Sequence, residues 1–333
     1  MVFAAMTIPY FYESAALATA LLWSFSSLAW SFSGRRVGAI AVTSIRTVLA
    51  SGVFVVLHLL IFGTPWPTGI DPEPFWLLVV SGVVGAGFSD LILFRGLVLI
   101  GPRLGMLILA LSPIFTVLIA YFSPMRETIG LQALAGILMT VGGVYWVVAE
   151  RPAVRRLPGS PSAPATPQTG WQVTPSQRRW GVILCLLSAV GSAIGFVLTR
   201  MAVRAGERMF TDGPPLAPVD SFAAAYIRVI SAMVALWVSL PLMRRTRQTL
   251  AAFSDGRAML IIAGGVIVGP VLGIWTSMVA FSGLESGIAT ALINTAPIML
   301  IPIAMFTYGD RPTWRTLVGT LIAVGGVFLL MVR

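Results

Sequence analysis

The sequence predicts an all-α integral membrane protein whose ten transmembrane helices form two inverted five-helix repeats. Three observations support this fold class. Hydrophobic residues make up 57% of the 333 residues and charged residues only 10%, whereas soluble domains carry about 45–50% apolar and about 25% charged residues. Ten apolar segments reach about 20 residues, the length that a helix needs to cross a hydrocarbon core about 30 Å thick. The two halves of the chain also resemble each other.

The predicted spans are separated by arginines, prolines and interfacial tryptophans, which end apolar helices at the membrane surface. Arg35 and Arg36 follow the first span, and Pro65 and Trp66 follow the second. We predict the spans 11–33, 38–62, 74–98, 102–123, 129–149, 179–200, 219–243, 258–283, 286–307 and 313–332.

One segment between the spans has a different composition. Residues 150–178 are rich in Pro, Ser, Ala and Thr and have no apolar period, which is typical of a flexible linker. The linker divides the chain into a first repeat, 12–149, and a second repeat, 179–332.

The repeats are visible in the sequence itself. RLGMLILALSP at 103–113 corresponds to GIATALINTAP at 287–297, and VGGVYWVV from Val141 corresponds to VGGVFLLMV from Val324. The two halves are offset by about 184 residues, the kind of fixed spacing that marks an internal repeat. Because each half holds five spans, an odd number, the second half enters the membrane with the opposite orientation. Inverted repeats are typical of secondary transporters, whose binding site lies near the membrane midplane.

These features resemble the EamA-type branch of the drug/metabolite transporter superfamily. The resemblance rests on the five-plus-five spans, the glycine pair near the end of each half, Trp23-Ser24 in the first span and an arginine early in each second span. Acidic residues at Glu127 and Asp310 open the last span of each half in the same way. The chain departs from the pattern where Ser188 stands as the counterpart of Trp23, and its linker is longer than usual.

The resemblance implies a secondary active transporter that exports amino acids or related small metabolites, coupled to protons. It implies a cavity among spans one to four and six to nine. It also implies that spans five and ten are peripheral or support a homodimer. The expected partners are a small-molecule substrate, membrane lipids and protons, in the inner or plasma membrane.

Asp90 is the sharpest functional candidate in the sequence. It lies about 12 Å from the nearer end of its span, where a carboxylate is costly unless it is protonated, hydrated or paired. It is therefore either a proton-coupling or amine-binding residue or a structural hydrogen-bond or ion-pair partner. Arg46 and Arg228 occupy corresponding positions, and they either anchor their helices at the headgroups or bind an anionic substrate group.

Weaker candidates complete the predicted site. Asn294 needs a polar partner in the membrane, and either substrate or a neighbouring helix can supply it. Prolines that interrupt helices free backbone carbonyls and permit hinges. The further cavity-lining candidates are Trp23, Ser89 and Trp275, and the predicted kinks are at Pro113, Pro270 and Pro297.

Composition and motifs argue against other classes. All 22 basic residues are Arg and the net charge is +10, but these arginines flank apolar spans, as topology signals do, rather than forming a nucleic-acid surface. The sequence has no P-loop, no zinc-protease motif and a single cysteine, so we expect no cofactor, no metal and no enzyme activity. Two alternatives stay open: a non-transporting scaffold or sensor, and a lipid-modifying enzyme using His58, Asp71 and Glu73.

The charge pattern also bears on orientation. About 14 of the 22 arginines lie in loops after the odd-numbered spans, which places the linker in the cytoplasm and both termini outside. The resemblance implies the opposite orientation, and we favour the charge count.

Overall fold

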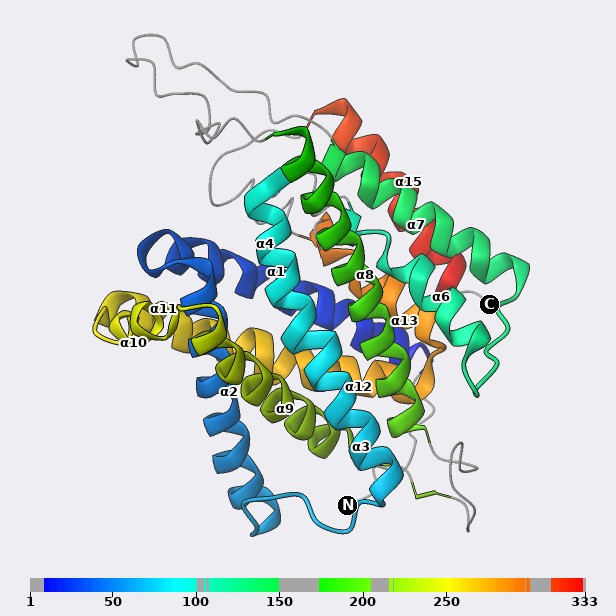
Figure 1. Ribbon diagram of the computed structural model, residues 1–333. Helices are drawn as coiled ribbons and strands as arrows, with labels where there is room; N and C mark the ends of the chain where they lie inside the picture. The colour runs from blue at the N-terminus through cyan, green and yellow to red at the C-terminus, as the bar shows by residue number, and fades with distance from the viewer. Residues whose placement is uncertain are drawn as a thin grey trace.

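The chain folds into a bundle of helices (Figure 1). The computed structural model describes residues 9–100, 105, 108–149, 174–204, 216–217, 219–296, 298–299 and 313–331. The helical segments of the first half are α1 (Phe11–Val37), α2 (Ala39–Phe62), α3 (Pro72–Val80), η1 (Ser81–Phe88), α4 (Ser89–Ile100), α6 (Ser112–Phe122) and α7 (Leu131–Ala149). Those of the second half are α8 (Pro175–Val203), α9 (Ser221–Leu242), α10 (Thr246–Ala252), α11 (Gly256–Val266), η2 (Ile267–Gly273), α12 (Ile274–Gly283), α13 (Ser286–Ile293) and α15 (Trp314–Met331).

The helices match the apolar character that the sequence predicts. Six helices of the described part are long and apolar enough to cross a membrane, and three shorter apolar helices lie at 112–122, 131–147 and 317–331. The start of the predicted fourth span, the end of the ninth and most of the linker lie outside the described residues. The described part therefore supports an all-helical membrane protein.

Local sequence signals set several helix ends. Gly38 and Gly63 follow α1 and α2 with φ angles of 89° and 73°, in the left-handed region that glycine adopts at little cost. Asp220 accepts hydrogen bonds from backbone N–H groups in the first turn of α9. Thr174 and Gln177 form a capping box at the start of α8, which satisfies N–H groups that have no partner within the helix.

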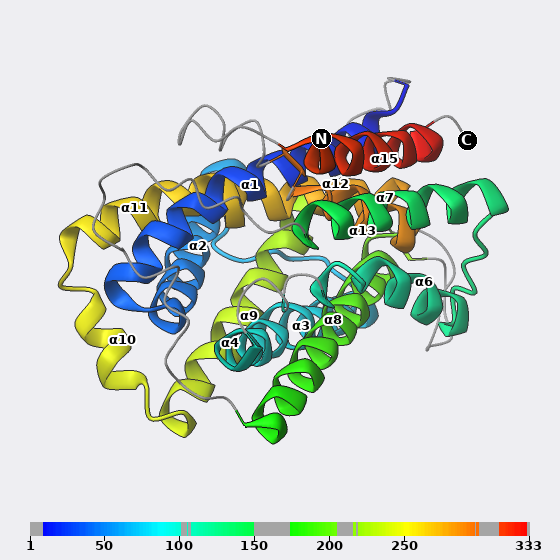
Figure 2. The same ribbon diagram turned by 90° about the horizontal axis from the view of Figure 1, so that it is seen from above.

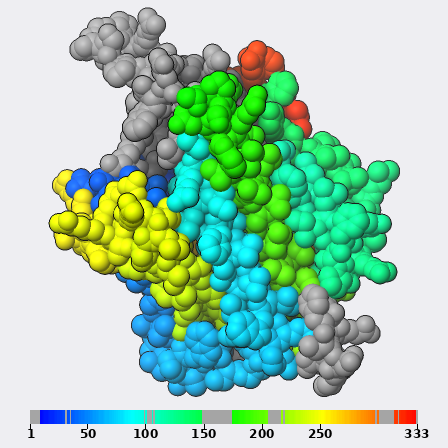
Figure 3. Space-filling model, in the orientation of Figure 1, coloured from blue at the N-terminus to red at the C-terminus, as the bar shows by residue number. Residues whose placement is uncertain are grey.

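The first helix of each half packs against the third helix of the other half. α1 packs along the whole of α11, η2 and α12, and α8 packs along the whole of α3, η1 and α4. The remaining spans pair with their counterparts, α2 with α9, α6 with α13 and α7 with α15. Figure 2 shows α8 beside α3 and α4, and α7 beside α15. In the space-filling view, the cyan surface of α3 and α4 lies against the green surface of α8 (Figure 3). The interior of the bundle is therefore built jointly by both halves.

Small residues make the α1 contact close. A Cβ on Gly265, Gly269 or Gly273 would lie within 3.0 Å of a side chain of α1. Trp23 contacts Gly273, and Trp30 contacts Gly265. Glycines at every fourth residue let two helix backbones approach closely in a membrane, and here they seat the tryptophans of α1 against the second half.

The pair α7 and α15 also meets through glycines. A Cβ on Gly143 would lie 2.6 Å from the carbonyl oxygen of Gly319, and one on Gly326 would lie 2.7 Å from the carbonyl oxygen of Gly136. The glycine faces of α7 and α15 therefore pack against each other within one chain. The second glycine of each VGG motif makes this contact, whereas a Cβ on Gly142 would meet nothing within 4 Å.

The third helix of each half contains a π-helical segment. η1 follows α3 and precedes α4, and η2 lies between α11 and α12. Their positions correspond at the offset of about 184 residues between the halves. π-helical turns interrupt the regular hydrogen-bond ladder and are frequent at functional sites. The sequence indicated the second of them only through Pro270.

Candidate functional site

A cavity of about 320 Å³ lies in the middle of the bundle. It is lined by α1, α2, η1, α4, α6, α8, α9, η2 and α12, so both halves contribute to it. Its volume is at the lower end of the range for small-molecule sites. Five of the seven predicted substrate or coupling residues line it: Trp23, Arg46, Asp90, Arg228 and Asn294.

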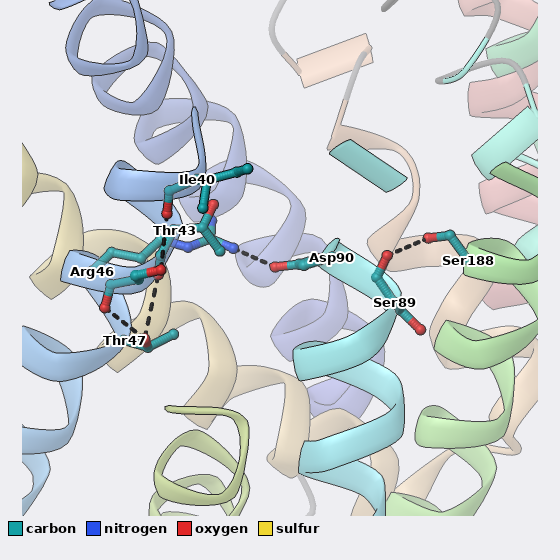
Figure 4. A network of polar contacts seen from close by, with 8 residues as sticks. Ile40, Thr43, Arg46, Thr47, Ser89, Asp90 and Ser188 are labelled. Carbon is teal, nitrogen blue, oxygen red and sulfur yellow. Dashed lines mark hydrogen bonds and ion pairs between the residues drawn. The ribbon is translucent and has the colours of Figure 1, made fainter. Parts of the chain in front are cut away.

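Arg46 and Asp90 form an ion pair at this cavity. Nη2 of Arg46 donates to Oδ2 of Asp90 across 2.5 Å, and the guanidinium lies over the ring of Trp30. Figure 4 shows Asp90 pointing toward Arg46 on α2, away from Ser188 on α8. The side chains are 22% and 31% exposed. The pair therefore neutralises two charges that would otherwise be costly in the membrane, while leaving both accessible from the cavity.

Arg228 lies deeper and has a different environment. It is only 5% exposed, and its Nη1 donates to Oγ1 of Thr199 and to the carbonyl oxygen of Gly195. Its guanidinium lies over the ring of Phe196, 5.4 Å from the centroid. Among the described residues, no carboxylate oxygen lies within the 4.0 Å ion-pair distance of Arg228. This arginine is thus held by neutral groups on α8.

Two interrupted helices meet beside the cavity. The chain turns at Ala110 and Leu111 before α6, and it turns at Asn294 and Thr295 after α13. These breaks correspond at the offset between the halves. Nδ2 of Asn294 donates to the hydroxyl of Ser112 across 3.0 Å, so the two breaks are joined directly.

The predicted kinks have distinct surroundings. Pro113 is buried in the first turn of α6, where a missing N–H leaves no helical hydrogen bond unmade. Pro270 lies within η2 and lines the cavity. Pro297 lies outside the described residues, but the hydroxyl of Ser24 lies 2.7 Å from the carbonyl oxygen of the preceding residue, Ala296.

Two predicted site residues lie apart from the cavity. Ser89 is buried against α8, where its carbonyl oxygen accepts a hydrogen bond from Ser188. Trp275 is 40% exposed and meets the ring of Phe222 edge-on. Each neighbours a residue that does line the cavity, Asp90 and Ile274, but successive residues on a helix point in different directions. We leave both out of the site.

His58, which the enzyme alternative required, has structural partners. Its Nδ1 lies 2.6 Å from the carbonyl oxygen of Thr64. Its ring packs among those of Phe62, Phe222 and Tyr226. Within the described ranges, no group of three or more His, Cys, Asp or Glu residues is arranged to hold a metal ion.

Some cavity residues were not singled out from the sequence. Ser112, Ser192 and Phe196 line it, and Thr199 holds Arg228. Serines and aromatic residues are common throughout the spans, so neither composition nor spacing distinguishes these four. The packing of α8 against η1 and α9 identifies Ser192, Phe196 and Thr199, and the hydrogen bond from Asn294 identifies Ser112.

A second hollow, of about 370 Å³, lies between α6 and α8. Leu118, Phe122 and Val197 are among its mainly apolar lining residues. Leu118 and Phe122 are exposed on the surface of the bundle, where a membrane protein contacts lipid tails. The described lining of this hollow contains no charged group for a polar solute.

A buried ion pair joins the halves away from the cavity. Nε of Arg200 on α8 donates to Oε1 of Glu127 across 3.2 Å, and the two side chains are 9% and 4% exposed. The other carboxylate oxygen of Glu127 accepts the backbone N–H of Ser286 at the start of α13. Nη1 of Arg200 donates to the carbonyl oxygen of Phe281 at the end of α12. We call these four residues the clasp.

An exposed ion pair joins the end of α1 to the start of α11. Nε of Arg36 at the end of α1 lies 3.0 Å from Oδ2 of Asp255, which caps α11. The N–H of Ala258 and the guanidinium of Arg36 both stabilise the charged carboxylate, so they hold the pKa of Asp255 below its ordinary value.

Comparisons with known proteins agree with this architecture. A solved structure described as "Crystal structure of protein" has 18% sequence identity to the chain, with 96% of each chain covered and a TM-score of 0.70. This likeness shows the fold alone. The comparison with curated proteins finds no match.

The model of the EamA-like transporter family matches residues 11–149 and 179–332. The two ranges leave out the intervening linker and cover most of the sequence. Together with the apolar helices, this match identifies an integral, multi-pass membrane protein of the transporter type. The chain belongs to the EamA-like transporter family.

Proposed function

We propose that this protein is a secondary active transporter that moves a small organic metabolite, such as an amino acid, out of the cell. The substrate binds in the central cavity, and alternating access between two inverted five-helix repeats exposes it to each side of the cell membrane. The observation that carries this proposal is the convergence of Arg46, Asp90 and Arg228 on one cavity lined by both halves. Charged side chains at membrane depth are expensive and mark transport pathways.

The helix interruptions support movement around this cavity. η1 and η2 occupy corresponding third helices, and the breaks at 110–111 and 294–295 occupy corresponding fourth helices. Discontinuous helices in corresponding positions of inverted repeats are typical of a transport site. In this proposal, the helix segments on either side of each interruption change their relative orientation while the cavity residues stay together.

The ion pair of Arg46 and Asp90 provides a means of proton coupling. Protonation of Asp90 removes its negative charge and weakens its bond to Arg46, which releases α4 from α2. The exposure of both side chains to the cavity gives a proton access to the carboxylate. A pH gradient then drives a change in the contact between these two helices.

Asp90→Asn tests this role. We expect the variant to fold and to lose the dependence of transport on an imposed pH gradient, because Asn cannot take up or release a proton. The measurement is flux into proteoliposomes of purified protein, with and without the gradient, using mixed amino acids, organic anions and organic cations. Glu13→Gln is the matched control, since Glu13 lies at the edge of the first span, and it retains gradient dependence. Gradient-dependent flux in Asp90→Asn would remove Asp90 from the coupling mechanism.

A further inference from the structure

We infer that the cavity selects small organic monoanions, with the anionic group bound by Arg228 and an apolar or aromatic body packed against the tryptophans of α1. This inference rests on the proposed transport function and narrows its substrate class from small metabolites in general to monoanions, so zwitterionic amino acids with no net charge are disfavoured. It starts from the charges that the described residues place around the cavity.

The charge balance of the cavity is positive. Its described lining contains two arginines and one aspartate, and it contains no other acidic or basic side chain. Arg46 and Asp90 neutralise each other across 2.5 Å. The positive charge of Arg228 is left over, and a solute carrying one negative charge balances it.

The environment of Arg228 favours binding of an anionic group. It is 5% exposed and forms no ion pair within the described part of the chain, and a buried charge that is not paired is costly. Both of its described hydrogen bonds use Nη1. Within the described part of the chain, no acceptor is found for Nε or Nη2. A carboxylate can accept two parallel hydrogen bonds from a guanidinium, so these free donors suit that group.

Gly85 lets η1 pack closely against α8 beside these donors. A Cβ at this position would lie 3.3 Å from Nη2 of Arg228 and 2.6 Å from Cα of Gly195. Gly85 itself lines the cavity. The absence of a side chain at Gly85 therefore lets α8 pack against η1 and keeps side-chain atoms away from Nη2 of Arg228.

The rest of the lining suits an apolar body. Trp23, Trp30 and Ile274 present apolar surface to the cavity, and Ser112 with Asn294 supplies polar atoms at its floor. An amine has no equivalent partner, because Asp90, the one carboxylate of the described lining, is already bound to Arg46. Zwitterions and cations are therefore disfavoured relative to anions of the same shape.

Three probes of similar shape test this selectivity: 3-phenyllactate, phenylalanine and phenethylamine carry net charges of −1, 0 and +1 at neutral pH. The measurement is isothermal titration calorimetry on the purified, detergent-solubilised protein. We expect 3-phenyllactate to bind at least about tenfold more tightly than the other two, since charge-assisted bidentate bonds are the strong ones. Equal binding of all three, tighter binding of phenylalanine or phenethylamine, or no binding of 3-phenyllactate would overturn the inference.

Substitutions assign the selectivity to Arg228. Arg228→Gln should reduce the affinity for 3-phenyllactate at least about tenfold, and Arg228→Lys should reduce it less, because Lys keeps the charge and loses the planar fork. The matched control is Arg95→Gln, since Arg95 lies on α4 with an exposed side chain and does not line the cavity. Unchanged affinity in Arg228→Gln would contradict the assignment.

A second variant tests the inference even if Arg228→Gln does not fold. Asp90→Asn frees Arg46 and gives the described lining two unbalanced positive charges. We expect it to bind phenylsuccinate, a dianion, at least about tenfold more tightly than the unaltered protein does. No gain would overturn the charge-balance argument. Binding of 3-phenyllactate without flux in proteoliposomes would support the site and contradict the transport proposal, whereas flux of phenylalanine alone would do the reverse.

Discussion

Replacing Glu127 with Gln is expected to lower the free energy of unfolding by about 3–5 kcal/mol, the usual effect of removing one partner of a buried ion pair. Gln has nearly the shape of Glu and retains an oxygen that can accept the N–H of Ser286. It has no charge, so the buried guanidinium of Arg200 loses its ion-pair partner and keeps the hydrogen bond to the carbonyl oxygen of Phe281. The loss is large because both side chains are buried, so solvent screens the pair little.

The measurement is reversible unfolding in mixed detergent micelles, followed by tryptophan fluorescence. Arg36→Gln is the matched control, because it breaks the exposed pair with Asp255 and leaves the cap of α11 in place. We expect a much smaller change there, since exposed ion pairs contribute little. An equal effect of the two variants would show that burial does not determine the strength of the clasp.

Gly143→Leu is expected to destabilise the protein by about 1–3 kcal/mol, the range for inserting side-chain atoms into a packed interior. A Cβ at Gly143 would already lie 2.5 Å from the backbone nitrogen of Ala323 and 2.6 Å from the carbonyl oxygen of Gly319. Both obstacles are backbone atoms of α15, which cannot move aside as a flexible side chain does. The substitution must therefore separate α7 from α15.

Gly142→Leu is the matched control one residue away. Gly142 is exposed, and a Cβ there would meet nothing within 4 Å. Leu is also a better helix former than Gly, so we expect this variant to be as stable as the unaltered protein or slightly more stable. The same unfolding assay compares the pair. Equal destabilisation by both substitutions would contradict the packing of α7 on α15 through Gly143.

The sequence predicts the helices better than it predicts their interruptions. The predicted span 38–62 became α2 (Ala39–Phe62), and 219–243 became α9 (Ser221–Leu242), because long apolar runs determine where a helix crosses a membrane. The short helix α10 was not predicted, since it is polar and lies between two spans. η1 was also missed, because a change from i→i−4 to i→i−5 hydrogen bonds leaves no mark in hydrophobicity.

In the candidate site, likewise, the sequence predicts some features and not others. Arg46, Asp90 and Arg228 stand out because charge at membrane depth is rare, whatever the surrounding fold. Their partners do not stand out, since Arg46 and Asp90 are 44 residues apart and belong to different helices. Ser89 is adjacent to Asp90 in the sequence but faces α8, and the sequence does not reveal which face of α4 meets α8. Which side chains form ion pairs, and which face of a helix meets its neighbour, depend on tertiary packing. A single sequence does not contain this information.

The central claim, that the solute passes through the cavity beside Arg228, is tested most directly by blocking that cavity. Cys185 is the only cysteine and is buried, so Cys185→Ala provides a background without thiols. Ser192→Cys places one thiol on the cavity lining, and Ser254→Cys places one on the exposed surface as the control. Both are treated with a negatively charged methanethiosulfonate reagent before flux is measured in proteoliposomes. We expect labelling of Ser192→Cys to abolish flux and excess substrate to slow that labelling, whereas labelled Ser254→Cys transports normally; full flux through labelled Ser192→Cys would contradict the account.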